Sequence, residues 1–177
     1  MKNKEILKRP RGVGFFIIVS YNSQEGYYKL KSETERLFSP VAFESAQLPK
    51  WNPEQSEFPF TLLGEFTRII SFKRRIHREE LPEMKKICVQ IREKFAKQDS
   101  TLRIIPGYMS SHNIIIASSF DDFHRIYLFH GVYAEIIYKY ERMKLQANET
   151  APDFFKSKDV IYFYTNLREF YLSQIKD

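Results

Sequence analysis

The chain has 177 residues, of which 43% are hydrophobic and 16% aromatic, so it can bury a core and is not intrinsically disordered. Its net charge of +6 comes from two basic segments, residues 1–12 and Lys73–Arg78, and the rest of the chain is slightly acidic, which excludes a uniformly basic nucleic-acid-binding surface. The single cysteine, Cys88, excludes an internal disulfide and fits a reducing compartment, so we expect a cytoplasmic protein.

We interpret residues 1–12 as a basic N-terminal arm and residues 13–177 as a single α+β domain. The apolar run Gly12–Tyr21 is short and is followed by no cleavage pattern, so it predicts a core strand instead of a signal peptide. No segment approaches the roughly 20 apolar residues that a membrane-spanning helix needs. We therefore expect no membrane association.

The first half of the chain predicts two strand–helix units. Gly14–Tyr21 reads as a buried strand, and apolar residues spaced by three and four then indicate a helix that ends before "SPV". Val41–Leu48 is a weaker strand, and residues 49–59, with three prolines, form a loop. Phe60–Phe72 predicts a strand bent at Gly64. Residues 79–97 predict the clearest helix, with Cys88 on its apolar stripe and Pro82 in its first turn.

The second half predicts an antiparallel meander and a closing helix. The strand candidates are "TLRIIPGYM", "NIIIASS", "HRIYLF" and "VYAEIIYKYERMKL", followed by a polar loop, "QANETAPDFFKSK", and a helix from about Lys158. The first six elements fit a ferredoxin-like β-α-β-β-α-β arrangement. The fold class that we expect is α+β, with a largely antiparallel sheet and helices packed on one face.

The familiar enzyme signatures are missing. The sequence has no phosphate-binding loop of the Walker type, no H-E-x-x-H and no G-x-S-x-G, and its "GVG" precedes a strand instead of joining a strand to a helix. These absences lower the odds of a common enzyme class. They leave the catalytic residues and the cofactor unassigned, and they predict no metal site.

The stretch "HRIYLFHGVYAE", residues 124–135, predicts a hairpin with polar residues inside it. A turn at Phe129-His130 places His124 opposite Glu135, a turn at His130-Gly131 makes them diagonal neighbours, and a three-residue turn places Arg125 opposite Glu135. A histidine beside a carboxylate can transfer protons or hold an anion. The same pattern also occurs as surface pairing, which contributes only about 0.2–1 kcal/mol. Tyr127 and Tyr133 are candidates to flank a ligand or, alternatively, packing residues.

The segment "RIIPGYMSSHNIIIASSFDDFHRIYLFHGVYAEIIYKY" resembles the signature half of the bacterial domain-of-unknown-function family DUF4416, and this chain resembles a divergent member. The match covers roughly Arg103–Ile175. The positions that the resemblance shares are these: Pro106, Gly107, Tyr108, His124, Arg125, Tyr127, Gly131, Tyr133, Glu135, Pro152 and Asp153. The chain departs from the family's pattern where Ile105 replaces an aspartate and Phe120 a lysine. The resemblance implies no established activity, and the GTP-binding label of some members implies a phosphate loop that is absent here.

Three functions are consistent with the sequence. The first is a binding or accessory protein that holds an anionic small molecule or a nucleotide near His124, Arg125, Tyr127, Tyr133, Glu135 and Tyr108. The second is an enzyme on a phosphorylated or nucleotide substrate, with His124 and Glu135 as its acid–base pair. The third and least favoured is an RNA-associated protein that uses the two basic segments. The sequence predicts no oligomeric state.

Overall fold

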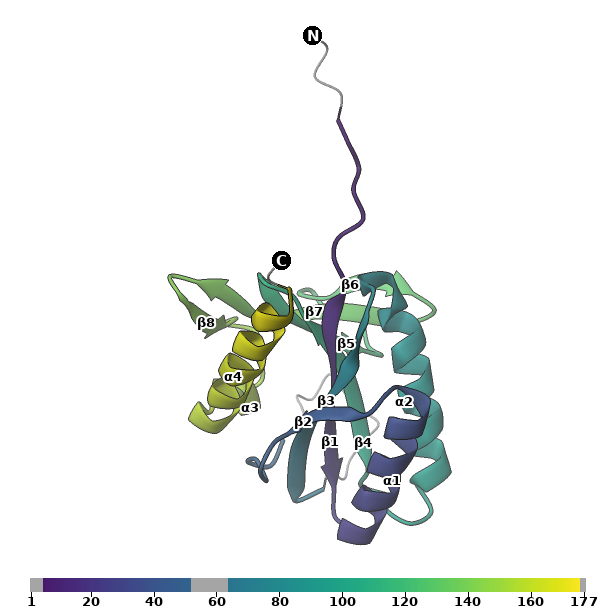
Figure 1. Cartoon of the computed structure of the whole chain (residues 1–177). Helices are drawn as coiled ribbons and strands as arrows, with labels where there is room; N and C mark the ends of the chain where they lie inside the picture. The colour runs from purple at the N-terminus through teal and green to yellow at the C-terminus, as the bar shows by residue number, and fades with distance from the viewer. Residues whose placement is uncertain (1–4, 52–63, 176–177) are drawn as a thin grey trace.

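The fold is built on one antiparallel sheet of eight strands, and the structure, a computed structural model, describes residues 5–51 and 64–175 (Figure 1). The strands lie in the order β2-β3-β1-β4-β5-β7-β6, and β8 pairs with β7. Their bounds are β1 (Val13–Tyr21), β2 (Val41–Glu44), β3 (Phe66–Ile76), β4 (Arg103–Met109), β5 (Asn113–Ser118), β6 (Ile126–Phe129), β7 (Val132–Glu141) and β8 (Lys144–Ala147). The α+β class and the antiparallel sheet are confirmed.

The helices begin and end at the signals that the sequence contains. The Ser23 side chain caps α1 (Gln24–Leu37) by accepting a hydrogen bond from the Gly26 amide. A short 3₁₀ turn, η2 (Arg78–Glu80), leads into α2 (Leu81–Phe95), and Pro82 lies in the first turn of α2, where it costs no hydrogen bond. The chain closes with α3 (Asp153–Lys156) and α4 (Lys158–Ile175).

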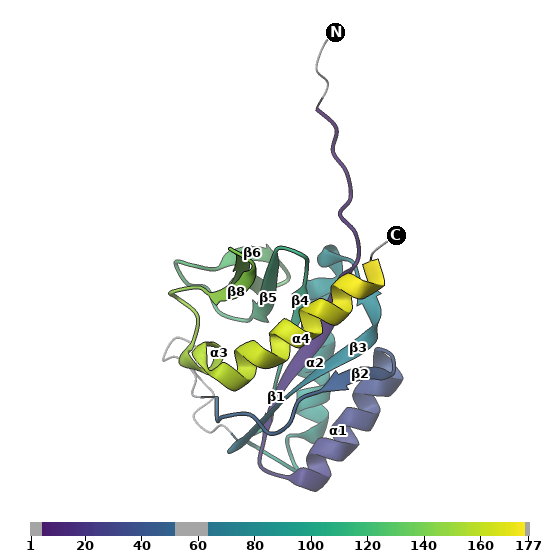
Figure 2. The ribbon, with the colours of Figure 1, turned by 60° about the vertical axis from the view of Figure 1, so that its left-hand side comes forward.

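Helices cover both faces of the sheet, so the prediction that they share one face is wrong. Phe15, Ile17 and Val19 of β1 pack against α1 and α2, whereas Phe16 and Ile18 belong to the core beneath α4. Figure 1 shows α1 and α2 on one side of the sheet and α4 on the other, and Figure 2 shows α4 crossing the sheet. Because β1 is apolar at nearly every position, both of its faces need cover.

The close packing of β1 against β4 requires glycine at position 107. Phe16 pairs with Gly107, and a Cβ atom at that glycine would lie 2.5 Å from both the Phe16 ring and the Ile115 carbonyl oxygen. The Phe16 ring also meets the Tyr164 ring of α4, with 5.1 Å between centroids. Gly107 therefore makes room for an aromatic contact that joins the sheet to α4.

Four local predictions need correction. The long strand expected after Gly131 is divided into β7 and β8 by a turn at Arg142 and Met143, both with positive φ. The strand expected at Val41–Leu48 ends at Glu44, and Leu48 makes only an isolated bridge to Thr67. The strand expected at Phe60–Phe72 runs from Phe66 to Ile76, and residues 60–63 lie outside the described residues. The polar loop before α4 contains the short helix α3.

The first six elements follow the order β-α-β-β-α-β, and their strands lie in the order β2-β3-β1-β4 with antiparallel neighbours. The ferredoxin-like description of this half stays a prediction. Within residues 5–51 and 64–175, none of the helices combines the length and the apolar character needed to cross a membrane.

Candidate functional site

The candidate site lies where one edge of the sheet is interrupted. On one side β5 pairs along Tyr133–Lys139 of β7, so β6 and β8 share the other side. There β6 pairs with Val132–Ala134 and β8 with Tyr138–Glu141, which leaves Glu135–Ile137 between them. Asn148, just after β8, hydrogen-bonds to the carbonyl oxygens of Ile136 and Ile137 at 2.7 and 2.9 Å. Glu135 thus lies in the part of β7 that is left between its two short edge partners, β6 and β8.

The β6–β7 hairpin has its turn at His130-Gly131, which is one of the three registers consistent with the sequence. Phe129 pairs with Val132, and both turn residues have positive φ, 49° and 75°, as a type I′ turn requires. The ladder is irregular between Tyr127 and Phe129. For this register the spacing predicted His124 as the diagonal neighbour of Glu135, and the structure brings both His124 and Arg125 into contact with Glu135.

Glu135, His124 and Arg125 form a nearly buried polar cluster. The Glu135 side chain is 2% exposed, and its two oxygens contact His124 Nε2 at 2.9 Å and Arg125 Nε at 3.2 Å. Arg125 also donates to the carbonyl oxygen of Phe120 at 3.3 Å. Burial raises the pKa of the Glu135 carboxyl, and the neighbouring guanidinium and imidazole oppose that rise. The cluster is therefore buried, unlike the exposed cross-strand pair that was the alternative interpretation of the sequence.

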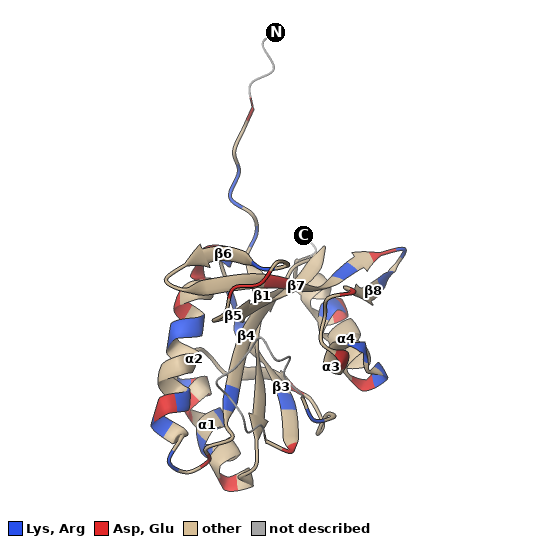
Figure 3. Cartoon of the chain, turned by 180° about the vertical axis from the view of Figure 1, so that it is seen from behind, with Lys and Arg blue, Asp and Glu red and all other residues tan. Residues whose placement is uncertain are grey.

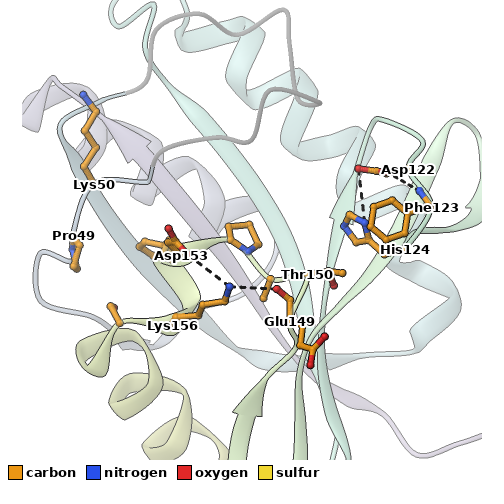
Figure 4. A pocket seen from close by; sticks show the side chains of 13 residues that line it. Pro49, Lys50, Asp122, Phe123, His124, Glu149, Thr150, Asp153 and Lys156 are labelled. Atoms are coloured by element: carbon orange, nitrogen blue, oxygen red, sulfur yellow. Dashed lines mark hydrogen bonds and ion pairs between the residues drawn. The ribbon is translucent and has the colours of Figure 1, made fainter.

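His124 connects this cluster to a cavity of about 620 Å³. Its ring lies between two carboxylates, since Nε2 contacts Glu135 and Nδ1 lies 3.8 Å from Asp122 Oδ2. Figure 4 shows the side of the ring that meets Asp122. The Nδ1 atom is buried and has no hydrogen-bond partner among the described residues. A carboxylate that holds one ring nitrogen fixes the orientation of the ring and leaves the other nitrogen for a further partner.

The remaining walls of the cavity are mostly polar and come from distant parts of the chain. Lys50 follows β2, Glu149 precedes α3, and Asp153 and Lys156 belong to α3 (Figure 4). Lys156 Nζ lies 3.7 Å from Asp153 Oδ1 and 3.3 Å from the carbonyl oxygen of Glu149. Charges of both signs on these walls suit a polar, charged molecule better than an apolar one. Over the described ranges, no three metal-ligating side chains come together.

The tyrosines predicted for the site lie elsewhere. Tyr127 and Tyr133 face each other across the hairpin, with 5.2 Å between ring centroids, and neither lines the cavity. Tyr108 lies on the opposite face of the sheet, in the core beneath α2, with the Arg78 guanidinium 6.0 Å from its ring centroid. Tyr108 pairs with Ile115 and Glu135 with Ile116, and because successive residues of β5 alternate between faces, Tyr108 and Glu135 lie on opposite faces of the sheet.

Sequence reasoning from the hairpin missed Lys50, Asp122, Glu149 and Lys156 as wall residues. Asp122 had a signal, because it lies two residues before His124, the first polar residue of the hairpin stretch. The family resemblance had marked Pro152 and Asp153, which also line the cavity. Lys50 had no signal, because it belongs to a segment with neither periodicity nor motif.

The basic segment Lys73–Arg78 is largely engaged within the protein. Arg74 pairs with Glu80 at 2.6 Å, and Arg75 donates to the carbonyl oxygen of Gln174, near the end of α4, at 2.6 Å. A cation at a helix C-terminus is favourable because it meets the negative end of the helix dipole. Figure 3 shows Lys and Arg interspersed with Asp and Glu over the helices. Much of the positive charge of this segment is therefore already paired with groups of the protein, so the segment does not need a nucleic acid to explain it.

The geometry defines an α+β protein with an eight-stranded antiparallel sheet and a polar cavity at an interrupted sheet edge. The chain belongs to the family DUF4416, a domain of unknown function, whose model matches residues 11–171. Neither the curated proteins nor the solved structures contain a match to it.

Proposed function

We propose that the protein binds a small, polar molecule with an anionic group in the cavity beside His124. The observation that carries this proposal is the cluster of Glu135, His124 and Arg125, whose imidazole forms part of the cavity wall. Removing these charged and polar groups from water costs free energy, and an ion pair that only covers the surface would not have to be buried. A cavity of about 620 Å³ lies within the range that small metabolites and nucleotides occupy.

Lys50 and Lys156 are the groups proposed to meet the anionic part of the ligand. Both line the cavity, and both pair with carboxylates at present, Lys50 with Glu65 and Lys156 with Asp153. These pairs are partly exposed, so exchanging a carboxylate of the protein for an anionic group of a ligand costs little. Asp122 and Asp153 would accept hydrogen bonds from hydroxyl or amino groups on the rest of the molecule.

The test is the thermal midpoint of the protein with GTP, GDP and ATP, each with Mg²⁺, and with inorganic phosphate. A ligand at a hundred times its dissociation constant stabilises by about 2.7 kcal/mol, which raises the midpoint by roughly 5–10 °C at this chain length. His124→Ala and Lys156→Ala should abolish the rise, whereas Lys144→Ala, at the exposed first residue of β8, should leave it intact. No rise with any of these probes, or a rise that the cavity variants retain, would contradict the proposal.

A second candidate is acid–base catalysis on a bound substrate, favoured by the 2.9 Å contact between His124 and Glu135. In that role Glu135 would orient the imidazole, and the ring would exchange a proton with the substrate. Glu135→Gln distinguishes the two functions. It should preserve most ligand affinity if the site only binds, and it should remove turnover of the bound ligand if the site is catalytic.

A further inference from the structure

The edge strand β6 has the composition of an interior strand. Its four residues, Ile126, Tyr127, Leu128 and Phe129, are all large and apolar or aromatic, and they are 37–63% exposed. In the described part of the chain, β6 pairs with β7 alone and ends the strand order of the sheet. Phe123, just before it, is 88% exposed. Such a concentration of exposed apolar side chains on one element is unusual for a surface that stays in water.

Natural proteins protect sheet edges with charges, prolines, bulges or short strands. The β6 strand is short and its ladder with β7 has one irregularity, but it contains no charge and no proline. Its apolar residues also alternate between the two faces of the sheet, since Ile126 pairs with Ala134 and Tyr127 with Tyr133. A partner that docked on one face would cover only half of them. A strand added to the edge would cover both halves.

We propose that β6 pairs antiparallel with β6 of a second copy of this chain, which joins two sheets into one across a two-fold axis. The strand is suited to pair with itself because it has no charge that would meet its own copy. An axis between Tyr127 and Leu128 places Ile126 opposite Phe129 of the other copy, so that apolar side chains meet. Two-fold interfaces need this kind of self-complementarity.

The exposed apolar area is adequate for such an interface. Phe123 and the four residues of β6 have a combined exposure equal to about three whole side chains, on the order of 500 Å². A standard interface buries about 800 Å² on each partner, and the strand backbones and neighbouring side chains would add to the apolar part. This dimer is independent of the ligand proposal, although Phe123 and His124 place the cavity next to it.

The experiment is a mass measurement by light scattering over a hundredfold range of concentration. The monomer mass is 21.2 kDa, and we expect twice that value at the high end of the range. Ile126→Lys should raise the dimer dissociation constant at least tenfold, because lysine on an edge strand opposes pairing. The matched control is Tyr162→Lys, which changes a 72% exposed aromatic residue on α4 and should leave the dimer intact.

A monomer mass over the whole range would overturn the proposal, as would a dimer that both Ile126→Lys and Phe129→Lys leave intact. Hydrogen exchange supplies a second readout that needs no substitution. The amides of Ile126–Phe129 should become more protected as concentration rises, while those of β2, at the other edge of the sheet, should not. Equal behaviour of the two edges would also contradict the proposal.

Discussion

At the scale of single residues, Glu135 and Arg125 form an ion pair of which both side chains are almost fully buried. Removing the carboxylate takes an anionic partner away from a buried guanidinium, and breaking a buried ion pair in this way is strongly destabilising. Glu135→Ala should therefore lower the free energy of unfolding by about 3–5 kcal/mol, as measured by urea denaturation. Asp153→Ala, which changes a fully exposed carboxylate, is the control and should cost far less, because exposed ion pairs contribute little to stability. Equal losses for the two variants would show that the buried pair does not stabilise the fold.

The Asp99 carboxyl is expected to make the stability of the folded protein depend on pH. It accepts hydrogen bonds from the amides of Asn22 and Ser23 at 2.7 and 2.8 Å and so ties the start of α1 to the chain after α2. Burial alone would raise the pKa of this carboxyl, but these bonds and those from Thr101 outweigh it and lower the pKa. The folded state then binds fewer protons than the unfolded state, so the stabilisation is complete above the unfolded pKa of about 3.9 and is lost as pH falls through the lower folded value.

Asp99→Asn should accordingly lose about 1–3 kcal/mol of stability at neutral pH and much less at the acid end, so its stability curve should be flatter than that of the wild type. Urea unfolding at a series of pH values down to about pH 3 measures the difference. Parallel curves for the two proteins would mean that the Asp99 carboxylate is not the titrating group.

At the scale of elements, the β1–β4 contact depends on Gly107. A methyl group there would lie 2.5 Å from a backbone oxygen and from the Phe16 ring, so the strands must separate or the ring must move. Gly107→Ala should cost about 1–3 kcal/mol and lower the thermal midpoint by about 3–10 °C. Gly12→Ala is the matched control, because its new Cβ would meet the nearest atom, Arg75 Cβ, at an ordinary 3.4 Å. A midpoint that changes equally in both variants would contradict this account of the packing.

The success of the element predictions followed the strength of the local signals. The strand at Gly14–Tyr21 and the helices near residues 79–97 and 158–175 were found because long periodic runs of apolar residues mark them. The division between β7 and β8 was missed because Arg142 and Met143 form the turn without glycine or proline. The helix α3 was missed because four residues are too few to show a period.

At the scale of the whole molecule, tertiary contacts decided what the sequence left open. The sequence of residues 124–135 predicted a contact of Glu135 with His124 or Arg125, because cross-strand neighbours in a hairpin follow from short-range spacing. The cavity walls from Lys50 and α3 did not follow, because they depend on how chain segments about 100 residues apart meet at the interrupted edge. That helices cover both faces of the sheet could have been predicted from the sequence, since β1 is apolar on both faces.

Helix α4 is the element on which the second core depends. Val160, Tyr164, Leu167 and Tyr171 are buried against the sheet, and each such side chain contributes roughly 1.5–3 kcal/mol. Together they supply about 6–12 kcal/mol, which equals the whole stability of a typical domain. A chain that ends at Ser157 should therefore lose cooperative unfolding in near-ultraviolet circular dichroism and bind an apolar dye. Removal of residues 1–10 should preserve cooperative unfolding, since the Arg9–Glu79 pair is exposed and exposed ion pairs contribute little to stability. Cooperative unfolding without α4 would show that the core beneath α1 and α2 folds by itself.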